Sequence, residues 1–270
     1  GIIFNDGSGW NYGRADDPRK PQYCYMRDAD YISGASIALR SDFWNAQGGF
    51  DEHYSVAYYE DTDMAFRVRQ AGLRVVVQPL SQLLHFEGIS SGTDTSSGAK
   101  QYQVSNAVLF KEKWSGVLSG HGKCDPAHLP ADRTSIGRIL VIDACTPTPD
   151  RDAGSLDAFQ HFRILKSLGL HVTFAPENLA HFGHYTRDLQ RIGIETLYAP
   201  YCMSFEELLT KSGKSYDLVL IYRAPVAKRL LDLVRTHAPQ AKIILETVDL
   251  HFLREEREAA LTHDPEKVKS

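Results

Sequence analysis

The sequence predicts an α/β protein that consists of an incomplete α/β domain followed by a doubly wound parallel sheet. Three observations support this fold class. Residues 138–245 alternate between β-branched runs and amphipathic helical segments, which is typical of a parallel sheet with helices on both faces. Residues 58–72 form one amphipathic helix among short extended runs. Residues 119–137 are rich in Gly, Pro, His and Asp, which indicates a linker between the two parts.

The first 120 residues predict short strands joined by loops and helices. Apolar and β-branched runs indicate extended segments at residues 2–4, 23–26, 36–39, 74–78 and 81–86. Ser41 suits the N-cap of a short helix, which Gly48 and Gly49 end. Residues 89–98 hold four serines, two threonines and two glycines, so they predict a loop.

The helix at residues 58–72 begins with acidic residues and ends at Gly72. Its apolar side chains recur at helical spacing, at Met64, Ala65, Val68 and Ala71. Glu60, Asp61 and Asp63 crowd its first turn, where free backbone N–H groups favour carboxylates. These acids either cap the helix, which is the usual role of acids in a first turn, or take part in chemistry.

A second helix is expected at residues 100–114. It places Tyr102, Asn106 and Phe110 on one face. This face either packs against the core or, through Asn106 together with Lys100 and Gln103, contacts a ligand.

The second part predicts five strands with intervening helices. The strands are expected at residues 138–142, 171–174, 195–198, 218–222 and 242–245, and the helices at residues 155–168, 185–192, 205–211 and 226–236. Ligands bind at the carboxyl ends of strands in such sheets, which makes Gly154, Ser155, Arg223 and His251 candidates for ligand contact. Gly154 and Ser155 would bring a backbone N–H at a helix start to an anionic or hydroxyl-rich ligand. The spacing is not G-x-G-x-x-G, which argues against a dinucleotide site.

Composition excludes several classes of protein. The net charge of −4 gives no support for a nucleic-acid surface, and no apolar run approaches the ~20 residues of a membrane span. The four cysteines lie far apart without C-x-x-C spacing, at Cys24, Cys124, Cys145 and Cys202. This pattern predicts reduced thiols in a cytoplasmic protein.

Four short motifs in the first part carry a family resemblance. They are S-G-A at residues 33–35, G-G-F-D-E at 48–52, E-D-x-D at 60–63 and H-x-x-G at 85–88. In this order they resemble the second half of the catalytic domain of family-2 glycosyltransferases, which have the GT-A fold, and the rhamnosyltransferase-like members above all. The resemblance covers residues 1–120.

The resemblance implies roles for individual residues. Asp61 matches the general base of an inverting displacement, with Glu60 beside it as a second catalytic carboxylate. His85 matches a ligand of Mn²⁺ or Mg²⁺, and these two cations suit imidazole and oxygen donors. Residues near the donor sugar are Asp30, Gly34, Ala35 and Asp63.

One part of the family pattern is absent from the sequence. The family's nucleotide-binding unit and its D-x-D motif precede the position at which this chain begins; residues 28–30 and 61–63 have the spelling of that motif but not its place. Because Gly1 opens in what looks like an interior strand, we expect a segment of a longer polypeptide. Such a segment would be inactive by itself and prone to self-association through uncovered apolar surface.

Residues 138–260 resemble the N-terminal Rossmann-like domain of family-4-like glycosyltransferases, which have the GT-B fold. This resemblance is less specific, because such sheets host many functions. The resulting organisation is a GT-A-like part at residues 1–120, a linker at 121–136 and a GT-B-like domain at 137–270.

The expected function is a segment of a multidomain glycosyltransferase. It would transfer a sugar from a nucleotide-sugar donor to a saccharide or lipid-linked saccharide of a growing cell-surface polysaccharide such as O-antigen, in the cytoplasm or peripheral to the inner membrane. One alternative is a non-catalytic scaffold that binds carbohydrate or partner proteins. Another is a nucleotide-binding regulator, against which the missing phosphate-binding glycine motif counts.

Overall fold

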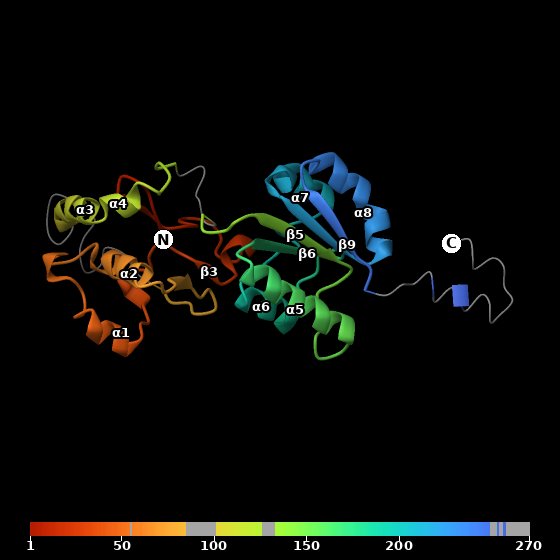
Figure 1. Ribbon diagram of the computed structural model, residues 1–270, viewed down its shortest axis with the longest axis horizontal. Helices are drawn as coiled ribbons and strands as arrows, with labels where there is room; N and C mark the ends of the chain where they lie inside the picture. The colour runs from red at the N-terminus through yellow and green to blue at the C-terminus, as the bar shows by residue number, and fades with distance from the viewer. Residues whose placement is uncertain (55, 85–100, 126–132, 249–252, 254–255, 258–270) are drawn as a thin grey trace. The chain divides into compact units, whose positions relative to one another are not determined.

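The structure is a computed structural model that describes residues 1–54, 56–84, 101–125, 133–248, 253 and 256–257 (Figure 1). The chain divides into two compact units, Gly1–Thr134 and Ser135–Ser270. The predicted α/β class is confirmed by a five-stranded parallel sheet flanked by helices in the second unit.

The second unit is a doubly wound sheet whose strands are all parallel. They are β5 (Arg138–Asp143), β6 (His171–Pro176), β7 (Glu195–Thr196), β8 (Leu218–Tyr222) and β9 (Lys242–Glu246). The spatial order is β7-β6-β5-β8-β9, so the chain builds outward from β5 on one side and then returns to build on the other. Ile139 pairs with Val172 of β6 and with Leu218 of β8. The point where the order reverses therefore lies between β5 and β8.

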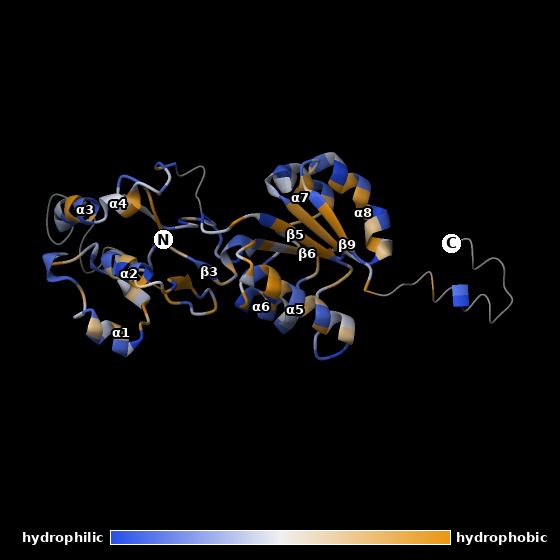
Figure 2. Cartoon of the chain, in the orientation of Figure 1, coloured by the Kyte–Doolittle hydropathy of each residue, from blue (hydrophilic) through white to orange (hydrophobic). Residues whose placement is uncertain are grey.

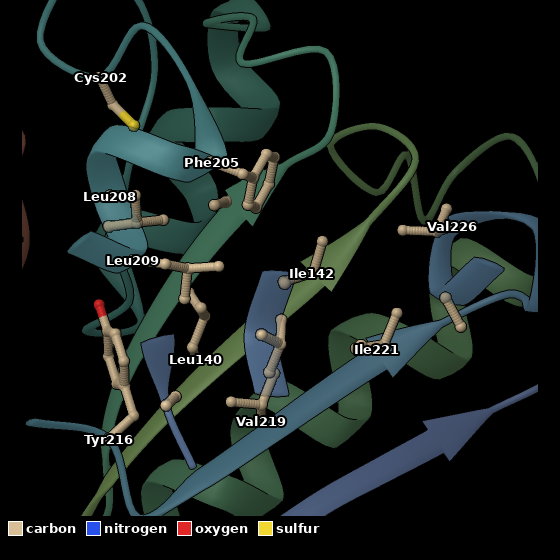
Figure 3. Close-up of a cluster of buried hydrophobic side chains, with 14 of the residues drawn as sticks. Leu140, Ile142, Cys202, Phe205, Leu208, Leu209, Tyr216, Val219, Ile221 and Val226 are labelled. Carbon is tan, nitrogen blue, oxygen red and sulfur yellow. The ribbon is translucent and has the colours of Figure 1, made fainter. Parts of the chain in front are cut away.

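Helices cover both faces of this sheet, α5 and α6 on one and α7 and α8 on the other (Figure 1). They are α5 (Ala153–Ser167), α6 (Gly183–Arg191), α7 (Phe205–Ser212) and α8 (Ala224–His237). Strand side chains alternate between the two faces. Leu140 and Ile142 belong to the cluster with Phe205 of α7 (Figure 3), whereas Ile139 and Val141 belong to the cluster on the α5 and α6 side.

Both faces of the central strands are buried, which explains why their sequences are continuously apolar rather than alternating. Hydropathy colouring shows this as apolar strands between helices whose residues change character along each turn (Figure 2). Every strand and helix predicted in this part of the chain is confirmed, with shifts of only a few residues at the ends.

The first unit contains short antiparallel ladders in its described residues. One pairs β1 (Ile2–Ile3) with β2 (Gly9–Trp10), and the other pairs β3 (Arg27–Asp28) with β4 (Val76–Val77). The helices are α1 (Ser41–Ala46), α2 (Glu60–Gln70), α3 (Gln101–Lys113) and α4 (Ser115–Leu118), with 3₁₀ turns at Pro21–Tyr23, Gly34–Ser36 and Glu52–Tyr54.

The core of the first unit lies between α2 and α3. Phe66 of α2 meets Phe110 of α3 edge-on, with ring centroids 4.9 Å apart, and Trp114 follows at 5.3 Å. Ile3, Tyr54 and Leu118 complete this buried cluster. Helix α2 is therefore fixed along its apolar side, while its first turn remains partly open to solvent.

Several predicted elements of the first part are wrong. Tyr23 is the last residue of a 3₁₀ turn, and residues 24–26 are not a strand. Residues 36–39 and 81–84 are not strands either. Residues 85–86 of the last predicted strand lie outside the described range. Arg40 is the N-cap of α1, in place of Ser41, which is its first residue. Ile37 does have an extended backbone, with φ −127° and ψ 140°. It has no paired strand among the described residues, and pairing is what makes an extended run a strand.

All four cysteines are free, as their spacing predicted. None of the helices in the described part of the chain combines the length and the hydrophobicity that crossing a membrane requires.

Candidate active site

Two consecutive tyrosines with left-handed backbone conformations lead into α2. Tyr58 has φ 75° and Tyr59 has φ 74°, and a non-glycine residue in that region costs roughly 1–3 kcal/mol. The buried side chain of Asn106, on α3, donates hydrogen bonds to the carbonyl oxygens of Ala57 and Tyr58, each at 3.0 Å. Tyr59 donates its hydroxyl to Gly7 O at 3.2 Å. These bonds stabilise a turn that the local sequence does not favour.

Asp61 lies in the first turn of α2 with its carboxylate partly exposed. Its Oδ2 accepts a hydrogen bond from Gly34 N at 2.7 Å, and its Oδ1 accepts from Thr62 N at 2.6 Å and Thr62 Oγ1 at 3.1 Å. A carboxylate offers about four acceptor positions. These three bonds fix the group and leave Oδ2 able to accept one more.

Gly34 lies against this carboxylate through its backbone N–H. A Cβ built there would come to 3.5 Å from both Cβ and Oδ2 of Asp61, which is ordinary contact distance. The exposed 3₁₀ turn Gly34–Ser36 is capped by Ser33, whose Oγ accepts from Ala35 N at 3.3 Å. The structure thus brings Gly34, which the sequence proposed for the sugar site, against Asp61, and Ala35 follows it in the same turn.

Glu60 carries a half-buried carboxyl group beside Asp61. Its Oε2 has no solvent exposure and no hydrogen-bond partner among the described residues. Burial raises the pKa of Glu60, and the neighbouring Asp61 charge adds to that rise. This carboxyl group therefore holds its proton more tightly than an exposed glutamate.

The Asp63 side chain is fully buried within the first unit. Its Oδ1 accepts from Trp114 Nε1 at 2.7 Å and lies 2.8 Å from Lys113 Nζ, while its Oδ2 forms an ion pair with Arg67 Nε at 2.9 Å. Tyr54 donates its hydroxyl to Oδ1 at 3.3 Å. The geometry gives Asp63 a structural part, in place of the substrate contact that the sequence suggested.

The G-G-F-D-E motif is the second anchor of α2. Arg67 donates to the carbonyl oxygens of Gln47 and Gly49, at 3.0 and 2.8 Å. Asp51 accepts from Lys113 at 2.8 Å, and this bond, followed by that from His53, holds the pKa of Asp51 well below its usual range. The G-G-F-D-E motif is therefore joined to α2 and α3 by one network of charged side chains, which contains Asp51, Asp63, Arg67 and Lys113.

Asp30 is also buried and its carboxylate is occupied by protein groups. Its Oδ2 accepts from Ile3 N at 2.7 Å, while Oδ1 contacts both Arg69 and Arg133. The sequence proposed Asp30 for the sugar site; the structure assigns its carboxylate to holding β1 against the end of α2.

His85, which we expected to be a ligand of Mn²⁺ or Mg²⁺, lies outside the described residues. Within the described ranges, no group of three His, Cys, Asp or Glu side chains gathers closely enough to hold an ion. Asp63, the other aspartate of α2, is already paired with Arg67 and Lys113. The described residues by themselves therefore do not form a metal site.

In the second unit, the predicted ligand residues bond mainly to protein. Asp152 caps α5 and accepts from both the backbone N–H of Ser155, at 2.7 Å, and its hydroxyl, at 2.6 Å. The N–H that we expected to meet a ligand is thus taken. Arg223, at the end of β8 with φ 71°, donates through Nε to Asp143 Oδ1 at 2.7 Å.

Gly154 and His251 are the other two residues of the second unit that the sequence proposed for ligand contact. A Cβ at Gly154 would approach Val248 Cγ1 to 3.1 Å, so Gly154 is closely packed against that side chain. His251 lies outside the described residues. Asp143, which the sequence did not single out, ends β5 and pairs with Arg223 across the point where the strand order reverses.

Comparisons with known proteins match only part of the chain. No family model matches it, and no solved structure does. Proteins from two strains of Mycobacterium tuberculosis, named N-acetylglucosaminyl-diphospho-decaprenol L-rhamnosyltransferase, are 31% identical over 90 residues, which is 33% of this chain and 29% of theirs. The O-antigen biosynthesis protein RfbC of Myxococcus xanthus is 31% identical over 99 residues, 37% of this chain and 7% of that protein.

The chain thus spans less than a third of the length of these curated relatives. Their names, a rhamnosyltransferase and an O-antigen biosynthesis protein, support a glycosyltransferase family for the matched stretch.

Proposed function

We propose that the first unit takes part in sugar transfer from a nucleotide-sugar donor to a saccharide or lipid-linked saccharide of a cell-surface polysaccharide, with Asp61 as the general base. The observation that carries this proposal is the Asp61 carboxylate itself. It is partly exposed, fixed by Gly34 N and Thr62, and retains an acceptor position on Oδ2. The relatives' names support glycosyl transfer as the class of reaction, and hexosyl or rhamnosyl transfer is the specificity that we propose.

The reaction is a displacement at the anomeric carbon. Asp61 Oδ2 accepts the proton of the acceptor hydroxyl, whose oxygen forms the new bond to the anomeric carbon. The bond from that carbon to the donor's diphosphate oxygen breaks, and its electron pair leaves with the nucleoside diphosphate. Attack from the face opposite the leaving group inverts the anomeric centre.

Glu60 contributes to this site electrostatically. Its raised pKa, caused first by burial, reduces the negative charge next to Asp61. Because its Oε2 is buried, we assign Asp61 rather than Glu60 to proton transfer.

A divalent cation, Mn²⁺ or Mg²⁺, would neutralise the charge on the departing diphosphate. The described residues do not provide a closed set of ligands for it, so no step above is routed through a metal. The proposal assigns His85 to that cation on the sequence resemblance alone.

We also propose that the second unit is the N-terminal domain of a GT-B module. Its support is the doubly wound strand order, with the Asp143–Arg223 pair at the reversal point.

The test is a transfer assay on the longest polypeptide in which the chain occurs. Nucleotide sugars that carry rhamnose or common hexoses are supplied with saccharide and lipid-linked saccharide acceptors, and products are identified by mass spectrometry. We expect an acceptor that has gained one sugar residue. Saccharide binding without product from any donor would overturn the enzyme proposal and favour the scaffold.

A further inference from the structure

A cationic cavity lies in the first unit near the C-terminal end of α2. It has a volume of about 370 Å³, and its lining includes four arginines and two aspartates: Arg27, Arg69, Arg74, Arg133, Asp28 and Asp30. Guanidinium groups are always charged in proteins, so the charged side chains of the lining carry an excess of positive charge.

The two carboxylates do not satisfy all four guanidinium groups. Arg74 forms a bidentate pair with Asp28, at 2.9 and 3.1 Å. Arg69 and Arg133 share a single oxygen of Asp30, Oδ1. Burial lowers the pKa of Arg69, and the adjacent Arg133 charge also lowers it. The Asp30 charge opposes this fall, so burial is its main cause.

Arg27 has no carboxylate partner among the described residues. Its guanidinium lies over the ring of Tyr12, 4.8 Å from the centroid, and its Nη1 atom has no solvent exposure and no hydrogen-bond partner in that part of the chain. The other three arginines of the lining each contact Asp28 or Asp30, so Arg27 is the one whose charge no described carboxylate offsets.

Arg69 and Asp61 lie at different places along α2. Arg69 follows Asp61 by eight positions, which corresponds to about 12 Å along the helix axis. Gly1, another residue of the lining, is close enough to Asp61 for that charge to act on its amino group.

We propose that this cavity binds the phosphate or diphosphate group of a small molecule, with Arg27 as its principal ligand. Several guanidinium forks around one space suit an anion with many oxygens better than a single carboxylate. The volume lies in the range of ligand pockets rather than of single ions, and Ile2, Leu73 and Val75 in the lining leave apolar surface for the rest of the molecule.

Calorimetric titration of the chain with inorganic diphosphate at low ionic strength tests this proposal. We expect a Kd below about 1 mM, at least about tenfold weaker in Arg27→Gln, the effect of losing one charge-assisted hydrogen bond. Arg14→Gln is the matched control, since Arg14 lies over the ring of Trp10, 5.9 Å away, and is exposed outside the cavity. It should bind like the parent chain.

The readout does not involve sugar transfer, so its failure is distinguishable from failure of the proposed function. Phosphatidylglycerol vesicles, added to the same titration, compete with diphosphate only if the phosphate group comes from a lipid. Absence of diphosphate binding by the parent chain would overturn the proposal, whether or not Arg27→Gln folds. Equal affinities of the Arg27→Gln, Arg14→Gln and parent chains would overturn it as well.

Discussion

Asn106 is an example of a buried polar residue whose contacts decide the shape of a site that it does not enter. It lies on α3, far along the chain from Asp61, yet its amide holds the carbonyl oxygens of Ala57 and Tyr58. Those carbonyls belong to the left-handed turn that precedes Glu60. The orientation of Asp61 therefore depends on a donor supplied by another helix.

Substituting Asn106→Leu keeps the volume of the side chain and removes both hydrogen bonds. We expect the first unit to lose about 1–3 kcal/mol, because two carbonyl groups lose their donor. Turnover should fall further than the fraction folded, with the loss in kcat rather than KM. Gln103→Leu, an exposed amide on the same helix, should change stability by less than about 0.5 kcal/mol. Unchanged turnover in Asn106→Leu would show that the turn does not need this anchor.

Glu60 makes the stability of the first unit depend on pH in a defined direction. Its pKa in the folded protein is raised above the value of 4.5 by burial. The folded state therefore binds this proton more tightly, and the stability it contributes at low pH is lost as pH rises through the folded pKa.

Glu60→Gln should accordingly stabilise the first unit at neutral pH, and the difference from the parent chain should shrink as pH falls through the raised folded pKa and be gone below 4.5. Denaturant titrations at several pH values measure this. Glu52→Gln, in an exposed 3₁₀ turn, is the control for removing a carboxylate. A stabilisation by Glu60→Gln that grows toward acid pH would contradict the assignment.

Among the elements, α2 is the one on which the first unit depends. It is held by the apolar contacts of Phe66 and by the buried charges around Asp63. A buried ion pair is not strongly stabilising relative to apolar packing, but removal of one partner leaves the other charges buried and unpaired.

Asp63→Ala should therefore destabilise the first unit by about 3–5 kcal/mol, because Trp114, Lys113 and Arg67 each lose a buried acceptor. Asp42→Ala removes an exposed acid from the first turn of α1 and serves as control, with an expected change below about 1 kcal/mol. Urea titration followed by tryptophan fluorescence measures both. A loss under 1 kcal/mol in Asp63→Ala would mean that the network is not essential.

The elements of the second unit were predictable because their signals are local. The apolar run at residues 138–142 and the amphipathic spacing at 155–168 identify a buried strand and its crossover helix without knowledge of partners. Residues 36–39 show the opposite case. Ile37 is extended, but an extended run becomes a strand only when another strand pairs with it, and the local sequence does not contain that partner.

The candidate site was predictable where a motif names the residue and not where a contact defines it. The motifs identified Asp61 and the turn at Gly34, which the structure brings to hydrogen-bond distance. They could not separate Asp61 from Asp63, because exposure of one acid and burial of the other follow from packing on α3. Asn106 offered a signal, namely an amide at the buried spacing of Tyr102 and Phe110.

At the scale of the whole molecule, the two compact units have separate cores. We expect them to unfold in distinguishable transitions. All three tryptophans, Trp10, Trp44 and Trp114, belong to the first unit, so fluorescence reports that unit while circular dichroism reports both.

Leu140→Ala, in the centre of β5, should destabilise the second unit by about 2–5 kcal/mol. The fluorescence transition should keep its midpoint, and the circular dichroism curve should shift in part. If both signals move together, the units unfold as one cooperative structure.

The central claim is that Asp61 accepts the proton during sugar transfer. The most direct measurement compares kcat and donor affinity for Asp61→Asn with those of the parent enzyme, and of Asp42→Asn as control. We predict a fall in kcat of about 100-fold or more, the usual effect of removing a general base, with donor affinity within about threefold because the charge, not the shape, has changed. An Asp61→Asn enzyme that retains more than about a tenth of the parent kcat would contradict the claim.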